Sequence, residues 1–365
     1  MWRTTQVRLG LGGFVKYVPS VYLIMSRKRS KLSSLGGVAI KPASRTTGII
    51  KVAEHPDGSA ETIPFVVVHG AEEGPSLWIT ACEHGDEVLS ASAVVEFMSR
   101  LDPGKVKGQV VAFPVLDSTA FNIKRRFSPI DSYDFSRAWP GFKNGWLAQQ
   151  VAARMFELMK AHADYVIDVH DGMPGIAEVA PYMIAGYERK EQWESAIKGF
   201  AESFLFDKII HWVGTSTERG ARTSTMMAAL LKEGIPSFVP EIGPDTKTGT
   251  EVALRGFENS MKYLGMLEGE PKRLPKYMAF PDVIHVFPTR GGVFKSYVSL
   301  EDEVKEGQKL ASIRSFTGEI TEELVSPAAG IVIAIWVLPM IGSGDFSAYE
   351  IATFGEFRKP WPGER

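Results

Sequence analysis

Apolar and polar residues alternate along most of the chain in a way that predicts strands and helices in turn. Short apolar runs typical of buried strands lie at residues 65–69, 77–80, 109–115, 165–170 and 237–241. Segments with apolar residues three or four positions apart predict helices over residues 88–98, 146–163, 191–204, 223–233 and 248–264. Strands separated by helices of this length indicate an α/β fold, in which a mostly parallel, mixed sheet carries helices on both faces.

The pattern changes after the proline-containing stretch 271–281. Residues 285–355 contain short β segments punctuated by Gly and Pro, without a helical run. We therefore predict an α/β domain over residues 46–275 and a small all-β domain over residues 276–365. Within the latter, segments 304–310 and 326–332 resemble the biotinyl/lipoyl hammerhead barrel, but its carrier lysine is not evident. We expect a shielding or assembly role for this domain rather than cofactor attachment.

Residues 1–45 form a basic extension, since the first acidic residue of the chain is Glu54. Their apolar part is interrupted by Lys16 and Pro19 and is too short to span a bilayer. A basic, acid-free segment is typical of a targeting sequence. A true start at Met25, or an arm that packs on a partner subunit, explains the pattern equally well. We expect a peripheral segment without a catalytic role.

Composition and charge narrow the class of protein. The chain has 365 residues and a formal net charge of −2, which excludes the basic footprint of a nucleic-acid-binding protein. The single cysteine, Cys82, excludes an internal disulfide and fits a reducing compartment, so we predict a cytoplasmic protein. Cys82 lies close to His84 and could act as a catalytic thiol. Its small apolar neighbours favour a packed, structural role.

The candidate chemistry begins where the strand at 77–80 meets the helix at 88–98. His84 and Glu87 lie at this junction, three residues apart, so that their side chains can converge on one point. Two histidines and a carboxylate that leave a fourth position open are typical of a catalytic zinc site. His-x-x-Glu alone is a weak signal, because a capping histidine near a solvated glutamate produces the same sequence pattern.

Further candidates follow two other predicted strands. His170 ends the strand at 165–170 and Glu241 ends the strand at 237–241. In folds of this type the active site collects at the carboxyl ends of strands, so His170 can provide a third ligand and Glu241 a general base. Each also has an ordinary explanation, as a hydrogen-bonded core histidine and a salt-bridged carboxylate. Their joint occurrence with His84 favours the metal site.

A loop of arginines, carboxylates and aromatic residues, 122–141, lies between these candidates. Arginine suits the bidentate capture of a substrate carboxylate. Asp134 can orient a ligand histidine through a hydrogen bond. A surface loop rich in ion pairs is the alternative explanation.

The ordered set of motifs resembles the succinylglutamate desuccinylase/aspartoacylase family, of the zinc carboxypeptidase-like superfamily. The motifs are His84-Gly85-Asp86-Glu87, Arg126, Asp134-Phe135-Ser136-Arg137, Asp168-Val169-His170 and Glu241-Ile242-Gly243. The resemblance covers residues 48–355, and its joint order is far more specific than any single motif.

The resemblance implies a site and an activity. One Zn²⁺ per chain would be held by His84, Glu87 and His170, with Glu241 as general base and acid. Arg126 would stabilise the oxyanion of the scissile carbonyl and Arg137 would bind a substrate carboxylate. Asn122 and Ser136 would join Arg137 in substrate binding, while Asp134 and Asp168 would support the ligand histidines. The predicted enzyme is a zinc-dependent amidohydrolase that removes the acyl group from an N-acylated amino acid or a related small amine.

The chain departs from the family at one point. Asp134-Phe135-Ser136-Arg137 stands where the family usually has Asp-Leu-Asn-Arg, so a short hydroxyl replaces the amide that helps Arg137. This change concerns the substrate rather than the metal. The alternatives are a zinc carboxypeptidase that acts on peptides and a catalytically silent homologue. The expected partner is a small N-acyl substrate, without nucleic acid or a membrane span. The acyl group, the amine and the oligomeric state, a homo-oligomer included, stay open.

Overall fold

The computed structural model describes residues 29–173, 176–187, 197–213, 224–243 and 245–360. A ten-stranded sheet runs through the larger part of the described chain. Its strands, in spatial order, are β21 (Glu356–Arg358), β12 (Tyr277–Phe280), β10 (Lys208–Val213), β9 (Tyr182–Tyr187), β11 (Ser237–Glu241), β7 (Tyr165–Val169), β5 (Glu72–Ala81), β6 (Lys107–Phe113), β4 (Ala60–His69) and β3 (Ser44–Glu54).

The centre of this sheet is parallel and its flanks are mixed. β11, β7, β5 and β6 run parallel to one another. On one flank β9 pairs antiparallel with β11, and on the other β4 pairs antiparallel with both β6 and β3. The carboxyl ends of β5, β7 and β11 therefore lie side by side, as predicted for the strands that precede His84, His170 and Glu241. β9 and β10 were not predicted from the apolar pattern.

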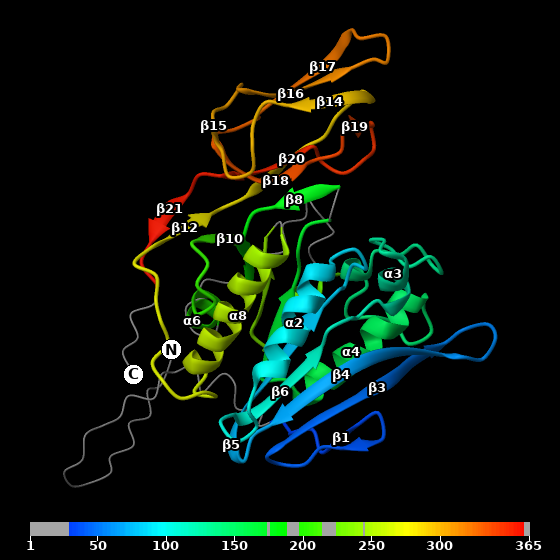
Figure 1. Ribbon diagram of the computed structural model, residues 1–365, viewed down its shortest axis with the longest axis vertical. Coiled ribbons are helices and arrows are strands. Elements are labelled where there is room, and N and C mark those ends of the chain that lie inside the picture. Colours follow the sequence, from blue (N-terminus) through cyan, green and yellow to red (C-terminus); the bar gives the residue numbers. More distant parts are fainter. Residues whose placement is uncertain (1–28, 174–175, 188–196, 214–223, 244, 361–365) are drawn as a thin grey trace, which may run out of the picture.

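Helices cover both faces of the sheet (Figure 1). One face packs on α2 (Val88–Arg100), α6 (Lys198–Glu202) and α8 (Thr246–Tyr263). The other packs on α4 (Leu147–His162) and α7 (Met226–Lys232). The predicted α/β fold with helices on both faces is confirmed. Part of the predicted helix 191–204 lies outside the described residues.

Phe257 of α8 holds the first of these layers together. It is fully buried, and its ring lies 4.9 Å from that of Phe97 in α2 and 5.4 Å from that of Phe204. We expect Phe257→Ala to lower the free energy of unfolding by about 3–5 kcal/mol, because it removes a large apolar group and leaves a cavity. Chemical denaturation measures this loss. Phe316→Ala, at an 82% exposed position, is the control, and a loss of less than about 1 kcal/mol in Phe257→Ala would contradict the packing role.

Two smaller sheets form from the C-terminal part of the chain (Figure 1). One contains β13 (Val283–Val286), β20 (Tyr349–Thr353), β18 (Gly330–Trp336) and β15 (Glu303–Val304), with β8 (Ala177–Val179) paired to β18. The other contains β17 (Ile320–Val325), β16 (Lys309–Arg314), β14 (Gly292–Ser296) and β19 (Met340–Ile341).

The large sheet and the C-terminal sheets exchange strands. β8 comes from within residues 46–275 yet pairs with β18, whereas β12 and β21 come from residues 276–365 yet extend the large sheet. A cluster of buried apolar residues that includes Tyr182, Ile184 and Ile333 spans the junction. This exchange fixes the C-terminal sheets over one edge of the large sheet.

The described part of the N-terminal extension packs on the face of the large sheet that α4 and α7 cover. β1 (Ser34–Leu35) and β2 (Val38–Ala39) form a short hairpin, and Leu32, Leu35 and Ile40 are buried beside α4. Residues 1–28 lie outside the described chain. None of the described helices has the length and hydropathy that crossing a membrane requires.

Candidate active site and metal centre

A tight turn between β5 and α2 positions His84 and Glu87. Cys82 begins the turn with a positive φ of 50°, and its thiol donates to the carbonyl of Glu87 over 3.0 Å. A Cβ at Gly85 would lie 2.0 Å from the carbonyl carbon of Ala120, so glycine is required at this close approach. Burial raises the pKa of the Cys82 thiol, which fits the predicted structural role for this cysteine.

His84, Glu87 and His170 meet at the carboxyl edge of the sheet. Nδ1 of His84 contacts Oε1 of Glu87, and Nδ1 of His170 lies 2.8 Å from Oε2 of the same carboxylate. One potential ligand atom from each residue falls within 4.8 Å of the others, and all three side chains are buried. The three residues predicted as metal ligands are therefore brought together.

The backbone places His170 and Glu241 beside each other. The amide of His170 donates to the carbonyl of Pro240, and the amide of Ile242 donates to the carbonyl of His170, each over 3.0 Å. Glu241 ends β11 and lines the same cavity as the triad. Neither hydrogen bonds nor ion pairs reach its carboxylate from the residues that the structure describes.

The buried charged groups of the site shift one another's pKa values. Burial alone would raise the pKa of Glu87, but the two histidines hold this pKa well below its usual range. Burial opposes the charged form of His170, but Glu87 and Asp168 raise its pKa above the ordinary value. Burial, with a smaller contribution from Glu87, raises the pKa of Glu241 well above that of an ordinary glutamate. A raised pKa is what a general base that works near neutral pH requires.

Two carboxylates hold the outer nitrogen of His170. Its Nε2 lies 3.2 Å from Oδ2 of Asp168 and 3.5 Å from Oε2 of Glu83. Thr80 donates to Asp168 over 2.7 Å, and Trp139 Nε1 donates to Glu83 over 2.5 Å. Asp168 thus lies where a residue that supports the ligand histidine was predicted. Glu83, Asp168 and His170 form a second group of candidate metal ligands.

The loop before α4 brings the remaining predicted residues to the site. Asp134 Oδ1 lies 3.3 Å from Nε2 of His84, and Arg126 Nη2 lies 3.4 Å from Oδ2 of Asp134. Arg126 also approaches Oε1 of Glu87 to 3.8 Å and lies 5.2 Å from the centre of the Phe346 ring. It therefore lies between the triad and the C-terminal sheets, at the wall of the cavity.

Ser136 occupies the position where the family usually has asparagine. In η1 (Phe135–Arg137), its hydroxyl donates to Asp134 Oδ1 over 2.7 Å and accepts from Arg137 Nη1 over 2.9 Å. The shorter side chain thus contacts the guanidinium of Arg137, which was expected to lose an amide that helps it hold the substrate carboxylate. Asn122, in contrast, is exposed on α3 (Ser118–Ile123) and is not among the residues that line the cavity. The structure does not bring Asn122 to the other predicted substrate-binding residues.

The cavity that contains these groups has a volume of about 690 Å³. Its floor comes from the ends of β5, β7 and β11, and part of its wall comes from β13, β18 and β20. Asp171 lines it as well, and caps α2 by accepting from the amide of Ser90 over 2.7 Å. Burial, with the nearby Glu87 carboxylate, raises the pKa of Asp171 to about 8.

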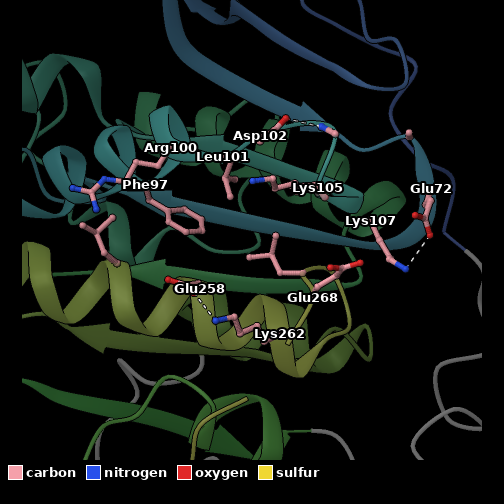
Figure 2. A pocket seen from close by; sticks show the side chains of 15 residues that line it. Glu72, Phe97, Arg100, Leu101, Asp102, Lys105, Lys107, Glu258, Lys262 and Glu268 are labelled. Atoms are coloured by element: carbon pink, nitrogen blue, oxygen red, sulfur yellow. Dashed lines mark hydrogen bonds and ion pairs between the residues drawn. The ribbon is translucent and has the colours of Figure 1, made fainter. Parts of the chain in front are cut away.

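A second hollow, of about 550 Å³, lies between α2, α8 and the loop that follows α2 (Figure 2). Phe97 contributes to its wall, and four of its charged groups form two ion pairs. Lys107 lies 2.9 Å from Glu72, and Lys262 lies 2.5 Å from Glu258. The candidate metal groups found among the described residues lie elsewhere. We assign this hollow no role in the chemistry.

Sequence reasoning missed four residues at the site. Glu83 directly precedes the predicted metal ligand His84, and this position next to a ligand was the available signal. Tyr182, His285 and Glu350 line the cavity from β9, β13 and β20. No local motif marks them, since they reach the site through strand pairing.

The donor set fits a divalent cation. Oε2 of the buried Glu87 has no hydrogen bond of acceptable geometry, although His170 Nδ1 is 2.8 Å away. When the proton of the neutral imidazole lies on Nε2, which faces Asp168 and Glu83, Nδ1 and Oε2 both present lone pairs, as two ligands of one ion do. Two imidazoles and one carboxylate are ligands that zinc prefers.

Comparison with known proteins identifies relatives of this chain. The model of the succinylglutamate desuccinylase/aspartoacylase catalytic domain matches residues 73–262. An N-alpha-acetyl-L-2,4-diaminobutyric acid deacetylase from Halomonas elongata is 28% identical over 281 residues, which are 74% of this chain and 80% of that protein. These names confirm the prediction of an amide-bond hydrolase.

Solved structures share the fold. A succinylglutamate desuccinylase from Silicibacter sp. TM1040 superposes with a TM-score of 0.77 at 24% identity, over 87% of this chain and 97% of that one. The product-bound ectoine utilization protein EutE (DoeB) from Ruegeria pomeroyi gives a TM-score of 0.76 at 23% identity, over 86% and 97% of the two chains. The matched catalytic domain covers more than half of the sequence, and the chain belongs to the succinylglutamate desuccinylase/aspartoacylase family.

Proposed function

We propose that the protein is a zinc-dependent hydrolase that removes the acyl group from an N-acylated amino acid. The convergence of His84, Glu87 and His170 within 4.8 Å, beside Glu241, carries this proposal. A divalent cation bound there would polarise the carbonyl of the substrate and lower the pKa of water. The deacetylase from Halomonas elongata supports an acylated amino acid as the substrate.

The side chains of this chain divide the remaining work. Glu241 takes a proton from the attacking water and passes it to the leaving nitrogen. Arg126 donates to the carbonyl oxygen as negative charge develops on it. Arg137, held by the Ser136 hydroxyl, binds the carboxylate of the amino acid. The carboxylates of Asp134 and Asp168 hold His84 and His170 in orientation.

Metal analysis and a substrate panel test the proposal together. Protein purified without chelators should contain about one zinc per chain, because the two candidate groups of ligands share His170. It should hydrolyse N-acetyl and N-succinyl amino acids faster than peptides with free C-termini. Faster cleavage of peptides would favour a carboxypeptidase instead. Protein that takes up no metal and cleaves neither class would be a silent homologue.

Arg126→Ala is expected to lower kcat by about 10²-fold, because the variant loses a donor to the oxyanion. Its zinc content should not change, since the guanidinium is not a ligand. Steady-state kinetics with the best N-acyl substrate measures the effect. Arg125→Ala, at the exposed neighbouring position, is the matched control and should keep wild-type kinetics. A rise in KM with an unchanged kcat would contradict the role in the transition state.

A further inference from the structure

The positive side chains of the cavity all lie on one side of the triad. Both of its guanidinium groups come from the loop 122–141, and among the residues that the structure describes no lysine lines it. The Ser136 hydroxyl joins Arg137 to Asp134. Asp134 in turn contacts His84, which follows β5. An anionic group of the substrate therefore finds a positive side chain on the β5 side of the triad.

A row of apolar side chains crosses the sheet on the opposite side of the triad. Val239 of β11 is opposite Ile184 of β9, which in turn is opposite Ile210 of β10. Residues directly opposite one another in a sheet point to the same face, and all three line the cavity. Glu241 follows Val239 by two positions in β11, so the row lies about 7 Å along the strand from the proposed general base.

Further apolar groups enclose this row. Val179 of β8 and Val283 of β13 line the cavity from the C-terminal part of the fold, and both belong to the apolar cluster that contains the row. Gly186 follows Ile184 by two positions, on the side away from Glu241, and its amide donates to Sδ of Met227 over 3.2 Å. Met227 of α7 therefore closes the far end of the row.

Part of this apolar surface is open to the cavity. Val239 and Val179 are half-buried, and Ile184 is 8% exposed. Apolar surface in a concave site next to a few placed polar groups is typical of a site that a ligand covers. An apolar ligand group would gain by burial there. A carboxylate would lose its water without gaining a positive partner.

We propose that the row of Val239, Ile184 and Ile210 binds the acyl group of the substrate. The preferred acyl group is then an apolar chain of about four to six carbon atoms, which spans the distance from the triad to the row. A scissile amide carries its amino acid and its acyl chain on opposite sides. With the α-carboxylate on Arg137, beside β5, the acyl chain extends toward β11 and β9. This inference rests on the proposed deacylase function.

Three acyl groups on one amino acid, the one that the substrate panel selects, test this subsite. The N-butanoyl and N-succinyl compounds differ by a methyl group in place of a carboxylate at the end of the same chain, and the N-acetyl compound lacks two methylene groups. Wild-type protein should favour the butanoyl compound in kcat/KM by at least about tenfold over each of the others, because methylene groups in a fitted apolar pocket are strongly discriminated.

A variant of the row tests the location of the subsite. Val239→Thr keeps the size of the side chain but places a hydroxyl where the chain binds. It should lower the preference for butanoyl over acetyl by at least about threefold, because the acyl chain would bury a hydroxyl group. Val95→Thr makes the same change at a 53% exposed position in α2 and should keep the wild-type preference.

Several outcomes would overturn the subsite and leave the deacylase function standing. They are equal kcat/KM for butanoyl and acetyl, faster cleavage of succinyl, and an unchanged preference in Val239→Thr. A preference for N-acetyl-L-norleucine over N-acetyl-L-alanine without an acyl preference would assign the row to the amino acid side chain instead.

If none of the compounds is hydrolysed, the proposed function fails. Calorimetric binding of the butanoyl and acetyl compounds to Glu241→Gln then decides the subsite alone. Tighter binding of the butanoyl compound would support it, and equal affinities would overturn it.

Discussion

Glu241→Gln is expected to lower kcat for an N-acyl amino acid by about 10³-fold while the zinc content stays at the wild-type level. The amide has nearly the shape of the carboxylate but cannot accept the proton of the attacking water, so the loss falls on the chemical step. Glu241 is not among the candidate ligands, and metal binding should survive. Steady-state kinetics and elemental analysis of the same preparation measure both quantities.

The fold should tolerate this change. Burial raises the pKa of Glu241 above its ordinary value of 4.5, so the folded state binds this proton more tightly than the unfolded chain does. The resulting stabilisation is present at low pH and is lost as the pH rises through the raised pKa. Near neutral pH the variant should therefore unfold with a free energy no lower than that of the wild type. Glu251→Gln, at an exposed position in α8, is the matched control.

The dependence of kcat on pH tests the same role of Glu241 as general base. A general base works in its unprotonated form, so kcat should fall as the pH falls below the pKa of Glu241. That decline should lie above the usual glutamate range and should be absent from the residual activity of Glu241→Gln. Unchanged turnover in the variant would remove Glu241 from the mechanism.

The predictable part of the site is local in the sequence. His84 and Glu87 stand three residues apart at a strand-to-helix junction, and His170 and Glu241 each end an apolar run. Because parallel strands present their carboxyl ends at one edge, the positions of these residues along the chain imply their meeting in space. The order β11, β7, β5 in the sheet places the three strands next to one another.

The unpredicted part depends on pairing between distant strands. Glu350 reaches the cavity because β20 pairs with β13 and β18, and Tyr182 because β9 joins β11 in antiparallel orientation. Neither register follows from apolar periodicity, which indicates a strand but not its neighbour. The exchange of β8, β12 and β21 between sheets is hidden for the same reason.

Single contacts could also not be read from residue types. Ser136 was expected to give Arg137 less help in holding a substrate carboxylate than the usual asparagine, and its hydroxyl contacts both Asp134 and Arg137. Asn122 was predicted to bind substrate beside Arg137, but it is exposed on α3. Loop composition indicated which segment approaches the site, and backbone conformation decides which side chains do.

Removal of a histidine ligand is expected to abolish both zinc binding and activity. With His84→Ala or His170→Ala, the triad keeps two of its three protein ligands, which is too few for a catalytic zinc site. Elemental analysis should show zinc near the background level in each variant, and zinc added to the chelator-treated wild type should restore its activity. His162→Ala, at a half-buried histidine that contacts Ser30, is the control and should keep its metal.

The two single variants also decide between the two candidate groups of ligands. His170 belongs to both groups, whereas His84 belongs only to the one with Glu87. If the ion were held by Glu83, Asp168 and His170 instead, His84→Ala would keep zinc and His170→Ala would lose it. The triad with Glu87 predicts that both variants lose it. Glu83 and Asp168 already accept from Trp139 and Thr80, which leaves the carboxylate of Glu87, with its unpartnered buried oxygen, as the better ligand.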